Sequence, residues 1–343
     1  MKKLLCIIYV LIFPVNNFYT QTITSDDLGF NSYSITNKEL GEINYYVSKN
    51  DSNIEKPILL YLDGSGAFPL FQQMKNGIGS TVIIDFQNLS KKFTIVLISK
   101  PNVPFIDSVK TEALIKFPIY HQSKIYKQRL SLNWRVQSAN LVLDKMHKIN
   151  PKNKIIVVGV SEGFQVGTKL ISINHDITYA LLFVGNGLSQ FYDFILQNRI
   201  DVNKKLITET QAQKNIDSLY SVFRSIYSDP KATDKEWFGH TYLRWSSFGS
   251  NNPTENIMSS KIPIYIVACS NDNNTSVLGT DYLFLESIRL KKKNITYKVY
   301  PYNHSFNEYI KDENGQIISV KNHTKEVFNR AFKWLNEKLQ MQL

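Results

Sequence analysis

The sequence contains very little cysteine: Cys6 and Cys269 are the only two among its 343 residues. Cys6 lies in an N-terminal segment that we expect to be removed, and one remaining cysteine cannot form an intramolecular disulfide. A small scaffold held together by disulfides is therefore excluded. The chain must rely on its hydrophobic core, and 43% hydrophobic residues over this length are enough to build one large domain.

Long apolar runs are scarce as well. The chain begins with Met1-Lys2-Lys3, followed by a mostly apolar stretch from Leu4 to Val15. This pattern is typical of a secretory signal peptide and is too short to span a membrane. We therefore expect residues 1–20 to be a signal peptide and the protein to be periplasmic or secreted. An uncleaved anchor is the alternative, but no stable membrane anchor is expected.

The formal net charge of +11 is not concentrated in one place. The lysines are dispersed among asparagines, and the only tight run is Lys291–Lys293. Because nucleic-acid binding needs clustered positive charge, we expect a solvated surface and no nucleic-acid partner. The sequence also has no Cys/His cluster with zinc spacing, no calcium-binding loop and no Walker sequence. We expect neither a metal nor an organic cofactor, and the oligomeric state stays open.

One motif stands out in residues 154–171. An apolar run rich in β-branched residues, from Ile155, ends in Gly159-Val-Ser161-Glu-Gly163, and a helix-like stretch follows directly. This is the G-x-S-x-G pattern of a nucleophile elbow, in which a sharp strand-to-helix turn exposes the serine hydroxyl. Larger side chains two residues before or after the serine would collide at such a turn. The pattern makes Ser161 a candidate nucleophile.

An aspartate and a histidine follow Ser161 in the order that a catalytic triad would require. Asp272 comes just after the predicted strand at 261–268, and His304 just after another predicted buried strand at 295–300. Functional groups gather at this end of parallel strands. Taken alone, an aspartate in such a loop is usually a turn former, and a histidine in an aromatic loop is more often a packed or solvated residue. The rival acid Asp281 falls in a predicted helix, and His323 precedes the last one.

A glycine-containing loop lies upstream, after the predicted strand at 57–62. It reads Asp63-Gly64-Ser65-Gly66, and a loop without bulky side chains allows backbone N–H groups to converge on an oxyanion. We expect one donor from Ser65 or Gly66, and the other from Glu162, which follows the candidate nucleophile. An ordinary glycine turn is the alternative.

These motifs together resemble the α/β-hydrolase superfamily, in particular its esterase and prolyl-oligopeptidase-like branches. The resemblance covers the chain from about residue 38 onward, and it implies an α/β fold with a mostly parallel sheet flanked by helices. The alternation of predicted strands and helices independently favours the same architecture. Two features depart from the family: Asp63 stands where many members have histidine, and Phe164 where a second small residue is common.

The interval between the predicted strands at 177–184 and 261–268 is too long for a simple connection. We interpret residues 186–260, within a hydrolase domain at 21–343, as a lid insertion with a helix near 204–227. Its aromatic residues Trp237, Tyr242 and Trp245 are candidates for the walls of a substrate pocket. Packing of the insertion itself is the alternative.

The sequence therefore predicts an exported serine hydrolase that cleaves carboxylic esters through a Ser-His-Asp triad and an acyl-enzyme. The expected partner is a small-molecule ester or a short peptide. One alternative is a serine peptidase of prolyl-oligopeptidase type acting on small peptides, although no segment ahead of residue 57 has room for the usual β-propeller. The other is a non-catalytic binding protein built on a hydrolase scaffold.

Overall fold

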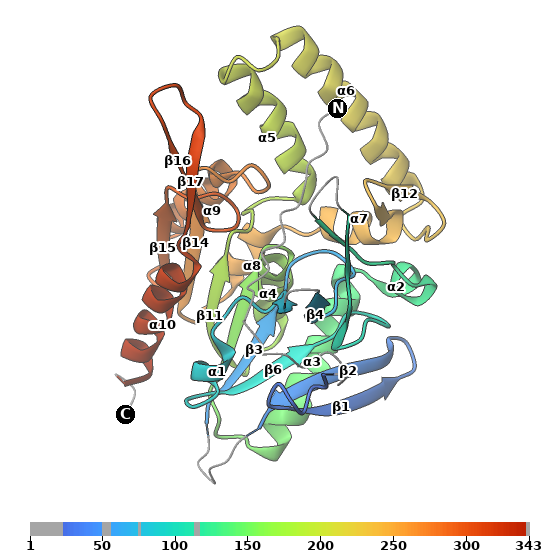
Figure 1. Cartoon of the computed structure of the whole chain (residues 1–343), viewed down its shortest axis with the longest axis vertical. Helices are drawn as coiled ribbons and strands as arrows, with labels where there is room; N and C mark the ends of the chain where they lie inside the picture. The colour runs from blue at the N-terminus through green and yellow to red at the C-terminus, as the bar shows by residue number, and fades with distance from the viewer. Residues whose placement is uncertain (1–22, 50–55, 75–76, 113–116, 341–343) are drawn as a thin grey trace.

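The computed structural model describes residues 23–49, 56–74, 77–112 and 117–340 (Figure 1). The predicted signal peptide lies outside these residues. Within them, no helix combines the length and the apolar character needed to cross a membrane.

A sheet of eight strands forms the centre of the molecule, in the order β1-β2-β6-β3-β10-β11-β14-β15. The pairs β1–β2 and β2–β6 are antiparallel, and every other pair is parallel. The expected mostly parallel sheet is thus confirmed. In the order of the sheet, the strands are Phe30–Asn37, Gly41–Ser48, Thr94–Ile98, Ile58–Leu62, Ile155–Val160, Ile177–Phe183, Ile264–Cys269 and Ile295–Tyr300.

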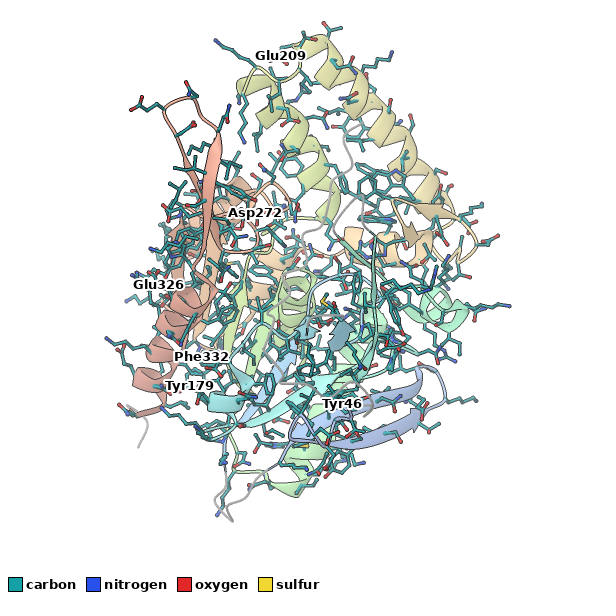
Figure 2. All side chains as sticks on the ribbon, viewed as in Figure 1. Tyr46, Tyr179, Glu209, Asp272, Glu326 and Phe332 are labelled. Carbon is teal, nitrogen blue, oxygen red and sulfur yellow. The ribbon has the colours of Figure 1, made fainter. Side chains whose placement is uncertain are left out.

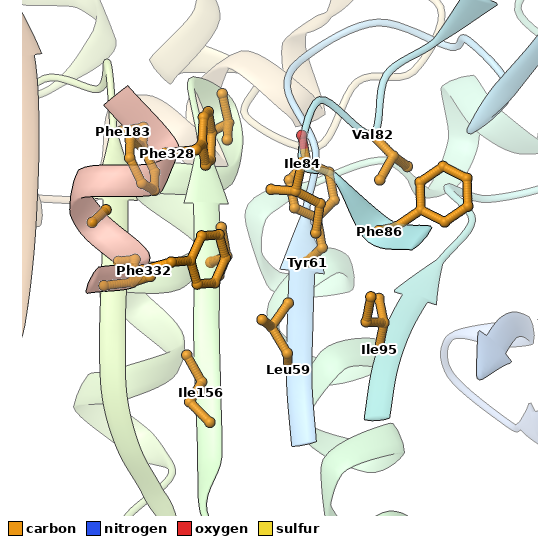
Figure 3. Close-up of a cluster of buried hydrophobic side chains, with 14 of the residues drawn as sticks. Leu59, Tyr61, Val82, Ile84, Phe86, Ile95, Ile156, Phe183, Phe328 and Phe332 are labelled. Carbon is orange, nitrogen blue, oxygen red and sulfur yellow. The ribbon is translucent and has the colours of Figure 1, made fainter. Parts of the chain in front are cut away.

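The central strands are apolar on both faces because helices cover both. In β3, Leu59 and Tyr61 belong to one buried cluster, whereas Leu60 and Leu62 belong to the cluster on the opposite face. Figure 3 shows the first cluster, where Phe183 of β11 stacks on Phe328 with ring centroids 4.2 Å apart. Helices α1 (Phe86–Leu89) and α10 (Thr324–Gln340) cover this face.

The opposite face is covered by α3, α4, α8 and α9 (Leu132–Ile149, Glu162–Ile173, Pro253–Ser259 and Val277–Arg289). The segment 124–149 before the elbow strand forms two helices, α2 (Lys124–Arg129) and α3. The division falls at Ser131, whose extended backbone ends one helix while its hydroxyl accepts from the N–H of Trp134 and caps the next.

The prediction of a buried strand at 295–300 is wrong in one respect. β15 is the last strand of the sheet, so it has one open edge, and Lys298 and Val299 are exposed. An apolar run by itself does not reveal whether a strand lies at the centre or the edge.

The segment between β11 and β14 contains α5 (Gln190–Asn203), α6 (Glu209–Ser228), the short strands β12 (Glu236–Trp237) and β13 (His240–Thr241), α7 (Tyr242–Gly249) and α8. Helices α5 and α6 form a pair that projects beyond the carboxyl end of the sheet, with Glu209 at its far end (Figures 1 and 2). The helix predicted over 204–227 begins later, at Glu209, because Lys204 is the C-cap of α5. Helix α5 is not among the elements predicted from the sequence.

Short strands outside the main sheet complete the fold. They are β4 (Phe71–Met74), β5 (Gly77–Ser80), β7 (Ile106–Ser108), β8 (Lys110–Glu112), β9 (Phe117–Ile119), β16 (Asn307–Lys311) and β17 (Ile317–Asn322). β16 and β17 form a hairpin that begins three residues after His304. This hairpin is not among the elements predicted from the sequence.

Candidate active site

Ser161 stands at a strained turn between β10 and α4. Its backbone angles are φ 57° and ψ −115°, which is an uncommon conformation for a residue other than glycine. A Cβ atom on Gly159 would lie 2.3 Å from the carbonyl oxygen of Gly163, and one on Gly163 would lie 2.0 Å from that of Leu62. The two glycines are therefore required by close backbone contacts, as the sequence pattern predicted.

The structure brings His304 into contact with both Ser161 and Asp272. The Nε2 atom of His304 lies 3.0 Å from Oγ of Ser161, and its Nδ1 atom lies 2.7 Å from Oδ2 of Asp272. The three side chains thus form one hydrogen-bonded line, although His304 is 143 residues from Ser161 in the sequence. Figure 2 shows Asp272 at the end of the sheet below α5.

Asp272 is held rigidly by its own loop. Its Oδ1 atom accepts hydrogen bonds from the backbone N–H groups of Asn274 (2.7 Å) and Thr275 (3.0 Å), and its Oδ2 atom accepts from the Thr275 hydroxyl (2.7 Å). Its side chain is only 1% exposed. Because Oδ2 also faces His304, the carboxylate of Asp272 can accept a hydrogen bond from Nδ1–H, which leaves Nε2 free to accept from the Ser161 hydroxyl.

The loop of His304 is fixed by its own turn and by the β16–β17 hairpin. Asn303 accepts from the N–H groups of Ser305 and Asn307 through its Oδ1 atom, and both distances are 2.9 Å. The side chain of Asn322, at the end of β17, donates to the Ser305 carbonyl at 3.1 Å. Local Asn-rich turns of this type were the available signal in the sequence.

Asp281 and His323, the alternatives to Asp272 and His304, have other hydrogen-bond partners. The Asp281 carboxylate accepts from the Tyr297 hydroxyl at 2.8 Å. His323 lies between the carboxylates of Glu308 and Glu326, with each contact 2.9 Å long.

The glycine-containing loop after β3 lies against the elbow. A Cβ atom on Gly64 would be 3.5 Å from Cβ of Ser161, and Gly66 has φ 93°, a conformation that favours glycine. Glu162 is the first residue of α4, where backbone N–H groups have no partner within the helix. The loop that contains Ser65 and Gly66 thus approaches Ser161 through Gly64, and Glu162 follows Ser161 in the chain. The roles of Ser65, Gly66 and Glu162 as oxyanion donors stay a prediction.

A chain of buried charges connects these two segments, and it was not predicted from the sequence. Lys100 contacts Asp63 (2.5 Å), Arg135 contacts Asp63 (2.6 Å) and Glu162 (2.8 Å), and Arg244 contacts Glu162 (2.5 Å). All five side chains are at most 5% exposed. The available signal was Arg135 itself, which shares an apolar helix face with Ala139 and Val142.

The charges in this chain stabilise one another. Burial by itself would raise the pKa of the Glu162 carboxyl, but Arg244 and Arg135 hold that pKa well below its usual range. Burial likewise acts to lower the pKa of Arg135, and the neighbouring Asp63 and Glu162 raise it above the ordinary value. Removing one member would leave a buried charge without its partner, which is strongly destabilising.

The predicted pocket aromatics lie in the core of the insertion. Trp245 is 5% exposed and packs with Phe191 and Phe223, and its indole N–H donates to the Trp237 carbonyl at 2.6 Å. Trp237 and Tyr242 are half-buried at the border of this cluster. Packing of α5, α6 and α7 is therefore one role of these residues, and their role as pocket walls stays a prediction.

The described residues contain no group of three or more His, Cys, Asp or Glu side chains arranged to hold a metal ion. That the protein needs no cofactor remains an expectation from the sequence.

Comparisons with known proteins bear on the fold. No family model matches the chain, and no curated protein matches its sequence. Among solved structures, Est1E from Butyrivibrio proteoclasticus superposes over 90% of this chain and 99% of its own, with a TM-score of 0.52 and 10% identity. An acylaminoacyl peptidase of Pyrococcus horikoshii superposes over 80% of this chain, with a TM-score of 0.50 and 10% identity. This chain spans only 38% of that peptidase. The chain has the α/β-hydrolase fold.

Proposed function

We propose that this chain, which has the α/β-hydrolase fold, is a serine hydrolase that cleaves carboxylic esters through an acyl-enzyme. The observation that carries the proposal is His304, whose two ring nitrogens lie within hydrogen-bond distance of Ser161 and Asp272. A nucleophile, a base in contact with it and a third group that orients the base are the parts required for acyl transfer.

Each step of the reaction has a group suited to it. His304 accepts the Ser161 proton at Nε2 while the serine oxygen bonds to the ester carbonyl carbon. Backbone N–H groups of Ser65 or Gly66 and of Glu162 hold the resulting oxyanion. His304 then gives its proton to the departing alcohol. Water, losing a proton to His304, attacks the acyl-enzyme, and the acid leaves as Ser161 regains its proton.

The strain at Ser161 supports a catalytic role over a purely structural one. A positive φ at a serine is costly, and such strain persists mainly where the surroundings and the function require it. A binding protein on the same scaffold would need neither this conformation nor the contact with His304.

The test compares Ser161→Ala and His304→Ala with the unchanged protein. We expect both variants to lose turnover of a short p-nitrophenyl ester and labelling by a fluorophosphonate. Ser172→Ala, in the same helix, is the matched control and should leave both unchanged, because its hydroxyl bonds only to the Lys169 carbonyl among the contacts described. Labelling that survives Ser161→Ala would overturn the proposal, and an inert but folded wild-type protein would favour the binding-protein alternative.

The peptidase alternative keeps the same chemistry and changes the substrate. The likeness to an acylaminoacyl peptidase is the observation that favours it, although this chain spans only 38% of that protein. Assays of short aminoacyl amides beside esters of the same acyl group separate the two. A higher kcat/KM for the amides would replace the ester proposal.

Export belongs to the proposal as well. The lysines and apolar residues at the start of the sequence support it. N-terminal sequencing of the protein recovered outside the cytoplasm should begin near Gln21, and an intact Met1 would contradict cleavage.

A further inference from the structure

We propose that Arg135 positions both halves of the oxyanion hole, and that the buried chain of charges from Lys100 to Arg244 holds it in place. This inference rests on the proposed function. Arg135 would be a positioning residue, since it acts through the backbone groups that bind the oxyanion and does not itself touch the substrate.

One guanidinium contacts both segments that supply the expected donors. Its Nη1 atom donates to the Asp63 carbonyl at 3.1 Å, to the Gly64 carbonyl at 3.5 Å and to Oε1 of Glu162 at 2.8 Å. Its Nη2 atom donates to Oδ1 of Asp63 at 2.6 Å. The planar, forked shape of arginine allows this set of bonds, and lysine, with a single nitrogen, cannot reproduce it.

The contact with the Gly64 carbonyl bears directly on the direction of a donor. The carbonyl of Gly64 and the N–H of Ser65 belong to the same peptide unit. In a planar trans peptide these two groups point in opposite directions. By binding the Gly64 carbonyl, Arg135 keeps that carbonyl pointing toward the guanidinium. The N–H of Ser65 therefore points away from the guanidinium. The adjacent Asp63 carbonyl, bonded more closely, fixes the preceding peptide in the same way.

The second half of the hole is held through a side chain. Glu162 supplies the other expected donor from its backbone. Its carboxylate accepts a hydrogen bond from Arg135 at Oε1 and another from Arg244 at Oε2. Arg244 belongs to α7 in the insertion, and its guanidinium lies 4.4 Å from the ring centroid of Trp245. The insertion is thereby tied to the elbow by a buried ion pair.

The buried side chains of this group alternate in charge along the contacts between them. Lys100, Asp63, Arg135, Glu162 and Arg244 alternate in sign, so each interior member has an opposite charge on both sides. The guanidinium of Arg135 places positive charge beside the two segments that supply the expected donors. Fixed charge of that sign stabilises an oxyanion without reorganisation during the reaction.

The experiment measures whether replacing Arg135 or Glu162 weakens stabilisation of the transition state more than it weakens substrate binding. Arg135→Lys retains the charge and removes the fork, and Glu162→Gln retains the backbone donor and the side-chain shape. We expect each to lower kcat by about 10- to 100-fold, since small displacements of catalytic groups have effects of this order, with KM changed less than about threefold. Affinity for an alkylboronic acid, whose adduct with the serine places an oxygen in the hole, should weaken by the same factor as kcat/KM.

A matched control distinguishes positioning from simple destabilisation. Val142→Ala lies on the same helix, at a fully buried position in the core away from the chain of charges. It should lower the melting temperature while kcat per fluorophosphonate-titrated site stays at the wild-type value. All variants are compared as the full mature protein, with the folded fraction measured by circular dichroism.

The inference is overturned if folded Arg135→Lys or Glu162→Gln keeps kcat and boronate affinity within threefold of wild type. It is also overturned if both variants lose activity only in proportion to folded protein, as an unstable core variant would, or if neither folds at all. A wild-type protein that fails to react with esters and fluorophosphonate would instead refute the proposed function. The two failures are therefore distinguishable.

Discussion

The replacement Asp272→Asn tests how the acid orients His304. Oδ1 of Asp272 accepts two backbone N–H groups, at 2.7 and 3.0 Å, so the asparagine must place its carbonyl oxygen at that position. Its NH₂ group then takes the position of Oδ2 and faces Nδ1 of His304. Because NH₂ donates and does not accept, the histidine must present an unprotonated Nδ1 to it and carry its proton on Nε2. That nitrogen can no longer accept the proton of Ser161.

The expected loss is large while the fold is retained. An acid that sets the tautomer of a catalytic histidine contributes about 10⁴-fold to kcat in triad enzymes, which corresponds to about 5.4 kcal/mol of transition-state stabilisation. The volume of the side chain is unchanged, and the backbone N–H groups of Asn274 and Thr275 keep their bonds to its oxygen. We therefore expect a cooperative thermal transition close to that of the wild type.

The assay is steady-state hydrolysis of a short p-nitrophenyl ester at pH 7, with the labelling rate by fluorophosphonate as a second readout. Asp281→Asn is the control, since that carboxylate contacts Tyr297 and not the histidine, and it should retain full activity. A folded Asp272→Asn protein within tenfold of wild-type kcat would refute the reasoning, and so would an equal loss in Asp281→Asn.

Two further predictions concern the insertion and the response to acid. Trp245→Ala should destabilise the protein by about 3 kcal/mol, because this 5%-exposed ring lies in the core of the insertion. Half-buried Trp237→Ala should keep the fold and change the ratio of kcat/KM between long and short acyl esters about tenfold; an equal loss for all esters would mean that the insertion does not govern specificity. Burial and the nearby Arg244 lower the pKa of His240 from 6.5 to about 3, so stability present above pH 6.5 is lost as the pH falls toward 3. Because His240 is partly exposed, we expect the free energy of unfolding in urea to fall by about 1 kcal/mol between pH 7 and 4.5. His240→Asn should not show this fall, and parallel pH dependences for the two proteins would contradict the prediction.

Much of the fold could be predicted from the sequence because it depends on local pattern. The apolar run 155–160 predicts a buried strand, and Gly159 and Gly163 predict the tight turn, since each is required by contacts within a few residues or with the adjacent strand. The order of Ser161, Asp272 and His304, each after a strand, predicted which side chains the parallel sheet would bring to one edge.

Other features were decided only by tertiary structure. The run 295–300 is mostly apolar, with Thr296 and Lys298 in it, and its position at the end of the sheet leaves it half-exposed. Helix α5 depends on packing against α6 and α7, and its own sequence has a polar second half that weakens any helical pattern. Trp245 could be identified as apolar from the sequence, but its place in the core of the insertion also depends on how these helices pack together.

The buried chain of charges illustrates the difference most clearly. Nothing local in the sequence relates Arg135 to Asp63, 72 residues away, or Arg244 to Glu162, 82 residues away. A charged residue on an apolar helix face signals that a partner exists, but the partner is chosen by how the strands and the insertion come together. The sequence determined the groups proposed for the chemistry and the edge at which they meet. The folded structure determined what holds them in place, because opposite charges can stabilise each other out of water only after distant segments have been brought into contact.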